Sequence, residues 1–164
     1  MDNFSLNGRI AWQKDRMILD DLVFRLEHYR SDDWELGDEC FCFFKTKYLV
    51  DQYAQFWTTR PNFQARRVLE LGIWDGGSVV FWFEWLQPEI HVAVDIMQRK
   101  DSAYFRRWVT ARGREKNVRT YWGTDQADGV ALRRIVARDC SDQLDVVIDD
   151  ASHMYEPTKR SFEA

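Results

Sequence analysis

The fold of this chain is decided by the stretch Arg67-Val68-Leu69-Glu70-Leu71-Gly72-Ile73-Trp74-Asp75-Gly76-Gly77-Ser78. An apolar segment with one acid leads into a glycine-rich turn, and a second apolar segment follows. This order predicts a buried strand, a tight turn and the first turn of a helix. In such a unit the glycines let the backbone approach a ligand, and the exposed N–H groups of the new helix bind polar groups. We therefore expect a loop that binds a nucleotide cofactor.

The spacing of the glycines distinguishes between classes of cofactor. A dinucleotide loop has glycines in the order Gly-x-Gly-x-x-Gly, whereas here Gly76 is the first glycine after Gly72. Glu70 and Asp75 also place two acids in and beside the turn. Carboxylates disfavour a pyrophosphate and favour a ligand that carries a cationic amino group or a ribose.

After this loop, strand-like and helix-like patterns alternate along the rest of the chain. The predicted strands lie near residues 67–73, 91–96, 118–122 and 144–149. The predicted helices lie near residues 77–87, 102–112, 127–138 and from 156 onward. Such a βαβ series predicts an α/β fold with a parallel sheet and helices on both faces, whose ligands bind at the carboxyl ends of the strands.

Residues suited to ligand binding stand at these carboxyl ends, namely Gly72, Asp95, Asp125 and Asp149. The acid-x-Gly-x-x-x-Gly pattern of residues 70–76 resembles the first motif of the class I S-adenosylmethionine-dependent methyltransferases. The motif Asp149-Asp150-Ala151-Ser152-His153 is similar to that of the metal-dependent sugar O-methyltransferases of the macrocin and mycinamicin type, to which the cephalosporin-hydroxylase-like group is related. The resemblance covers residues 45–164 and implies a Rossmann-like fold.

The resemblance also implies which residues surround the cofactor. They are Glu70, Gly72, Trp74, Gly76, Gly77, Ser78, Asp95, Asp125, Gln126 and Asp149. The glycines would line the methionine part, while Glu70 would hold the loop or the amino group. Asp95 would accept both ribose hydroxyls. Asp125 and Gln126 would lie near the adenine.

These positions have structural alternatives that the sequence leaves open. The glycines suit a tight strand–helix turn without a ligand. Asp95 suits the N-cap of a following segment, and Asp125 or Asp128 suits a cap of the next helix. Among the eight tryptophans, Trp82 and Trp85 have helical spacing and are expected to pack against the sheet, so that Trp74 is the tryptophan expected to meet a ligand.

The same resemblance implies a metal-assisted reaction. Asp150 would supply an oxygen ligand to Mg²⁺, and His153 would be the general base, because imidazole exchanges protons near neutral pH. In the alternative, His153 is an exposed loop histidine or a cap for the helix near Pro157. His91 has no acid beside it in the sequence and is expected to lie on the surface or to pack within its strand.

The composition limits the class of protein. With 164 residues, 45% of them apolar, the chain suits one globular domain with a sizeable core. A formal net charge of -4 and scattered lysines and arginines give no surface for nucleic acid. No apolar stretch reaches the length of a membrane span, and charges near the start replace a signal-peptide core, so we expect a cytoplasmic protein. The three cysteines lack zinc-site spacing and are expected to be reduced thiols.

Two regions are expected along the chain. Residues 1–65 would form an N-terminal helical segment, with one amphipathic helix within 1–31, a loop at 31–37 and a second helix at 45–57. Residues 66–164 would form the N-terminal half of an S-adenosylmethionine-binding domain. In the family, the sheet continues beyond the fourth strand and carries further acids of the metal site. The patterns in this sequence reach only the fourth strand and the helix after it. We therefore expect weak metal binding, and an exposed edge on the fourth strand through which two copies pair.

Together these patterns predict an S-adenosylmethionine-dependent methyltransferase, or a fragment of one. It would methylate a hydroxyl of a sugar or another secondary metabolite with the help of a divalent metal. The expected partners are this small-molecule acceptor and a second copy of the chain, not nucleic acid or a membrane. Two alternatives remain open: a NAD-dependent oxidoreductase, which Asp95 also suits, and a non-catalytic cofactor-binding or assembly module.

Overall fold

The strands of the protein form two sheets in the computed structural model, which describes residues 6, 8–26 and 39–164. The first sheet has the order β1-β2-β3-β4. Its strands are β1 (Ile10–Trp12), β2 (Arg16–Leu19), β3 (Leu22–Leu26) and β4 (Phe41–Phe43). Strands β1, β2 and β3 are antiparallel, and β4 runs parallel to β3.

The second sheet is parallel and has the order β7-β6-β5-β8. Its strands are β5 (Arg67–Leu71), β6 (Ile90–Asp95), β7 (Val118–Trp122) and β8 (Val146–Asp149). The helices are α1 (Lys47–Thr58), α2 (Gly77–Leu86), α3 (Ala103–Ala111), α4 (Gly129–Cys140) and α5 (Tyr155–Phe162). The predicted α/β class with a parallel sheet is confirmed, and the fold is compatible with a Rossmann-like arrangement.

The strand order of the parallel sheet defines a position for a ligand by topology alone. The chain builds the sheet outward from β5 through β6 to β7 and then returns to add β8 on the other side of β5. Open α/β sheets bind ligands where the strand order reverses, in the crevice outside the carboxyl ends of the strands. This position lies between the ends of β5 and β8.

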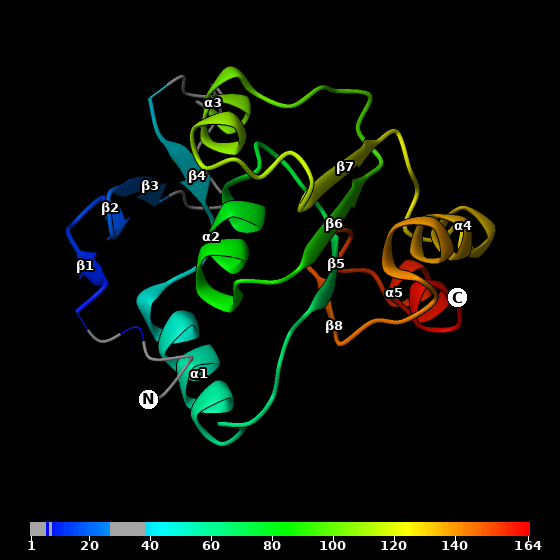
Figure 1. Cartoon of the computed structure of the whole chain (residues 1–164), viewed down its shortest axis with the longest axis horizontal. Helices are drawn as coiled ribbons and strands as arrows, with labels where there is room; N and C mark the ends of the chain where they lie inside the picture. Colours follow the sequence, from blue (N-terminus) through cyan, green and yellow to red (C-terminus); the bar gives the residue numbers. More distant parts are fainter. Residues whose placement is uncertain (1–5, 7, 27–38) are drawn as a thin grey trace.

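Helices cover both faces of the parallel sheet (Figure 1). On one face, α2 and α3 pack through buried residues such as Val80 and Phe105. On the other face, α4 packs through Leu132 and Ile135 against the side chains of β5 and β6, and α5 lies beside α4. Within the described residues no helix is long and apolar enough to cross a membrane.

The helix predicted within residues 1–31 is wrong for the described part of that region, where β1, β2 and β3 lie instead. Alternate residues there face the core: Met17, Leu19, Leu22 and Phe24. The helical interpretation counted the half-buried Ile18 and Val23 as core residues, which hid this period of two. Asp20 has a φ of 54° at the turn between β2 and β3, a conformation that aspartate tolerates. The loop predicted at 31–37 lies outside the described residues.

Helix α2 joins the two sheets into one core. All of its residues except Ser78 are buried, because β4 and α1 cover the side that the parallel sheet does not. Trp82 and Trp85 belong to this core, where their rings stack on each other. The region before residue 66 therefore shares a hydrophobic core with the parallel sheet, and Phe43 of β4 reaches the ring of Phe81.

Candidate functional site

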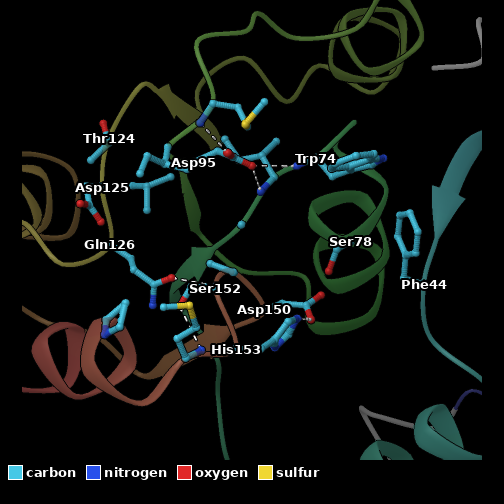
Figure 2. A pocket seen from close by; sticks show the side chains of 18 of the residues that line it. Phe44, Trp74, Ser78, Asp95, Thr124, Asp125, Gln126, Asp150, Ser152 and His153 are labelled. Carbon is cyan, nitrogen blue, oxygen red and sulfur yellow. Dashed lines mark hydrogen bonds and ion pairs between the residues drawn. The ribbon is translucent and has the colours of Figure 1, made fainter. Parts of the chain in front are cut away.

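A cavity of about 1020 Å³ opens at the carboxyl ends of the parallel strands. Its wall includes the segments that follow all four strands, together with residues 42–45 at the end of β4 and just after it, and the start of α5. Figure 2 shows Thr124, Asp125 and Gln126 on one side of this cavity and Phe44, Trp74 and Ser78 on the other. The cavity includes the position between β5 and β8 at which the strand order reverses.

Gly72 brings the loop after β5 close to the end of β8. Its φ is 104°, and a Cβ atom at this position would lie 2.6 Å from the backbone oxygen of Asp150. No other residue type fits both requirements. Gly72 lines the cavity, whereas Gly76 and Gly77 lie behind its wall, where a Cβ atom would collide with the ring of Phe105 or with the backbone oxygen of Cys42.

Two bulky residues in the cavity wall have left-handed backbone conformations. Trp74 has a φ of 56° and His153 a φ of 53°. Such values are uncommon outside glycine, and strained residues of this kind concentrate at ligand sites. The ring of Trp74 meets that of Phe44 edge-on at 5.7 Å, and the guanidinium of Arg99 lies 4.8 Å from its centroid. Trp74 is thus held at the cavity, where the sequence placed it.

Asp95 connects the loops that follow β5 and β6. Its Oδ2 accepts the backbone N–H groups of Ile73 and Trp74 at 2.8 and 3.0 Å, and its Oδ1 accepts that of Met97 at 2.8 Å. A carboxylate oxygen can accept two hydrogen bonds, so Oδ1 keeps capacity for a further donor. Asp95 lines the cavity and is therefore a loop anchor that can still bind a ligand hydroxyl.

Glu70 lies beneath the loop and outside the cavity. Its side chain is fully buried, and its Oε2 lies 3.0 Å from Nε2 of His91 on the neighbouring strand. His91 packs within its strand, one of its two expected environments, and the sheet places an acid beside it that its sequence neighbours do not supply, because Glu70 and His91 are distant in sequence. This buried pair lies between β5 and β6, so Glu70 is placed to support the sheet under the loop rather than to face a ligand.

Asp75 binds the glycine-rich loop to the first sheet. Its carboxylate accepts the backbone N–H groups of Cys42 at 2.6 Å and Gly77 at 2.8 Å. Burial raises the pKa of the Asp75 carboxyl, although these two hydrogen bonds oppose the shift by favouring the charged form. One of the two acids that suggested a cationic ligand thus has both oxygens engaged within the protein.

The segment after β7 shapes another part of the wall. Asp125 accepts the backbone N–H of Ala127 at 2.8 Å, and the N-cap of α4 is Asp128, one of the two candidates for that cap. The Oε1 atom of Gln126 accepts the backbone N–H of Ser152 at 3.0 Å. Asp125 and Gln126 both line the cavity, and Gln126 fixes the position of the loop after β8.

Asp149 and Ser78 occupy different environments at the site. The carboxylate of Asp149 lies behind the wall, where the side-chain amide of Gln126 approaches both of its oxygens at 3.5 Å. Ser78 lines the cavity at the start of α2. Its Oγ is buried and forms no hydrogen bond within the described residues. A polar ligand group would satisfy this hydroxyl.

Asp150 lies between a lysine and the histidine expected to be the general base. Its Oδ2 forms an ion pair with the ammonium of Lys45, and its Oδ1 lies 4.0 Å from Nε2 of His153. All three side chains line the cavity. The sequence did not predict Lys45 as a site residue, since it is 105 positions from Asp150 and belongs to no motif. Its position directly after the aromatic segment 41–44 was the only signal in the sequence.

The described residues do not fit the Mg²⁺ ion that the resemblance implies. They contain no group of three His, Cys, Asp or Glu side chains that could hold a metal ion. Mg²⁺ is usually held by one or two carboxylates together with water ligands, so the charge state of each carboxylate decides the fit. Asp150, the expected ligand, already neutralises the ammonium of Lys45.

Comparisons with known proteins add no family assignment. No protein-family model, no curated protein and no solved structure matches the chain. The resemblance to methyltransferases therefore rests on the motifs of residues 70–76 and 149–153. The structure adds that residues from both motifs line the same cavity.

Proposed function

We propose that this chain binds S-adenosylmethionine in the cavity and directs its methyl group to a hydroxyl of a small molecule, such as a sugar or another secondary metabolite. The observation that carries the proposal is the contact of Gly72 with Asp150. It joins the cofactor-loop motif to the motif expected to do chemistry, at the point where the strand order reverses.

The wall residues suit the parts of this cofactor. The loop from Gly72 to Asp75 and the unsatisfied hydroxyl of Ser78 would hold the methionine part. The remaining acceptor capacity of Asp95 suits a ribose hydroxyl, and residues 124–127 would border the adenine. The described cysteines are free, which suits a reducing compartment, and we place the reaction in the cytoplasm.

His153 is the group in the cavity that suits proton removal from the acceptor. When bound, the cofactor supplies a methyl group whose bond to the acceptor oxygen forms as its bond to sulfur breaks, with the electron pair retained by sulfur. The hydroxyl proton needs a base on the protein. The side chain of His153 is 70% exposed on the cavity wall, so an acceptor can reach its imidazole.

The test is methyl transfer from isotope-labelled S-adenosylmethionine to a panel of glycosylated and other hydroxyl-bearing metabolites. We expect at least one acceptor to gain a labelled methyl group on oxygen. The surface variant Lys47→Met serves as the control for expression and handling, because Lys47 is exposed and pairs with Asp51 on α1. Hydride transfer with NAD would instead support the oxidoreductase alternative. Cofactor binding without transfer to any acceptor would favour the non-catalytic module.

A further inference from the structure

Lys45 is a buried cation in the cavity wall. Its side chain is 5% exposed, and its partner Asp150 is 34% exposed. Lys45 lies between β4 and α1, whereas Asp150 follows β8. A lysine is almost never buried to this degree unless a carboxylate compensates its charge. The pair is therefore a defined part of the site that connects the N-terminal region to the end of the parallel sheet.

This ion pair uses the carboxylate on which the resemblance places a metal ion. An ammonium beside Asp150 neutralises that carboxylate and repels a second cation at the same position. The neighbouring Asp149 is approached by the side-chain amide of Gln126 and by the backbone N–H of Ala151.

We propose that the ammonium of Lys45 occupies, beside Asp150, the place where the resemblance puts a divalent cation, so that Lys45 and a metal ion compete for this carboxylate and Lys45 holds it beside His153. The proposal rests on the proposed function. Lys45 is a positioning residue, because it acts by holding one oxygen of Asp150 while the other lies 4.0 Å from the imidazole of His153. The carboxylate of Asp150 thus lies between the ammonium of Lys45 and the imidazole of His153 in the cavity wall.

The test compares Mn²⁺ binding by the wild type with binding by Lys45→Met, Lys45→Arg, Asp150→Asn and the double variant K45M/D150N. Mn²⁺ is the probe because carboxylates bind it and its free form is measured directly by electron paramagnetic resonance. Lys47→Met is the matched control, since it removes an exposed lysine from an ion pair on α1. The same samples are titrated with S-adenosylmethionine, and circular dichroism checks that each variant is folded.

We expect no Mn²⁺ uptake at about 1 mM by the wild type, Lys45→Arg or Lys47→Met. Lys45→Met leaves an uncompensated carboxylate and should bind Mn²⁺ roughly tenfold more tightly or better, and Asp150→Asn should abolish that gain. If Lys45→Met does not fold, Lys45→Gln replaces it, since the amide keeps a hydrogen-bond donor without the charge. A merely structural lysine would not produce this pattern.

Three results overturn the inference. Two of them leave the proposed function intact, and the third removes it as well. Mn²⁺ uptake by the wild type that Asp150→Asn abolishes shows a metal site despite Lys45. An absent gain in both Lys45→Met and Lys45→Gln shows that Lys45 does not compete with metal. In either case S-adenosylmethionine binding leaves the proposed function intact. A folded wild type that does not bind S-adenosylmethionine removes the proposed function and, with it, the role of Lys45.

Discussion

Asp95 and Asp150 are two carboxylates of the cavity wall, and the protein engages them differently. Asp95 accepts three backbone N–H groups and so fixes the loops that would enclose a cofactor. Asp150 pairs with the ammonium of Lys45, and its Oδ1 lies 4.0 Å from Nε2 of His153. Its carboxylate therefore interacts with charged or titratable side chains rather than with the backbone. The first arrangement suits binding, and the second suits control of charge beside a reacting group.

The backbone of His153 allows its chemical role to be separated from its structural one. Its φ of 53° costs about 1–2 kcal/mol in most residues but little in glycine. We therefore expect His153→Gly to be about 1 kcal/mol more stable toward unfolding than His153→Ala. Both variants should lower turnover roughly 10²- to 10⁴-fold while leaving cofactor affinity nearly unchanged.

Chemical denaturation gives the difference in stability between the two variants. The methyl-transfer assay gives their turnover, and calorimetry gives their affinity for the cofactor. Equal stability of the two variants would indicate that the left-handed conformation of His153 is wrong. Retained turnover in both would remove His153 as the base while leaving cofactor binding untouched.

At the scale of elements, the glycine-rich loop is held by contacts to three different strands. Asp95 of β6 binds its backbone, Asp75 binds it to β4, and Gly72 lies against the residue after β8. A change in any of these contacts should reach the cavity, because the loop forms part of its wall.

The close approach of Gly72 can be tested by adding a single methyl group. Gly72→Ala introduces both an unfavourable φ and a collision with the backbone oxygen of Asp150 at 2.6 Å. Gly113→Ala is the matched control, since Gly113 has a φ of 62° and a Cβ atom there would have no other atom within 4 Å. We expect Gly113→Ala to cost about 1 kcal/mol and Gly72→Ala about 1–3 kcal/mol more, with weakened cofactor binding. Similar costs in both variants, measured by denaturation, would contradict this contact.

The reactivity of Cys42 reports whether β4 covers the loop. Burial raises the pKa of its thiol to about 12, with the nearby charge of Asp75 acting in the same direction. The reactive thiolate is therefore about one part in 10⁴ of the population near pH 8. We expect iodoacetamide to modify Cys40, which is only half-buried, well before Cys42 and Cys140. Peptide mass spectrometry after timed alkylation shows the order, and early loss of the Cys42 thiol would speak against this packing.

Strands β5, β6 and β8 were predictable because each combines an apolar segment with a glycine or acid at its end. The first sheet was not, since half-buried residues such as Ile18 and Val23 gave its strands an apparent helical spacing. The pairing of β8 with β5 brings Asp150 to Lys45, which is 105 positions away in the sequence. No local sequence pattern could therefore predict their contact. The pairing of Glu70 with His91 has the same cause, because sheet register sets it.

At the scale of the whole molecule, the two sheets share α2 as a common core element, and the cavity draws on both. Phe44 and Lys45 reach the cavity from the end of the first sheet, whereas the motif residues reach it from the second. The N-terminal region therefore contributes directly to the site. Substitutions at β4 should alter the cavity even though they lie outside the motifs.

The outer strand β8 is the strand through which we propose that copies of the chain pair. Among the described strands it pairs with β5 alone, and Val147 on it is 50% exposed. An unpaired edge strand is a template for another strand. We expect sedimentation velocity to show concentration-dependent dimers, and Val147→Lys to reduce them. A monomer at every concentration, in the wild type as well as the variant, would exclude this pairing.

The most direct test of the central claim is a calorimetric titration of the wild-type chain with S-adenosylmethionine and, separately, with NAD. The claim predicts that S-adenosylmethionine binds and that NAD binds more weakly or not at all, because the glycine spacing of the loop disfavours a pyrophosphate. Asp95→Ala should weaken the binding of S-adenosylmethionine by about 1–3 kcal/mol, whereas Asp51→Ala on the surface of α1 should not. Tighter binding of NAD, or binding that Asp95→Ala leaves unchanged, would contradict the claim.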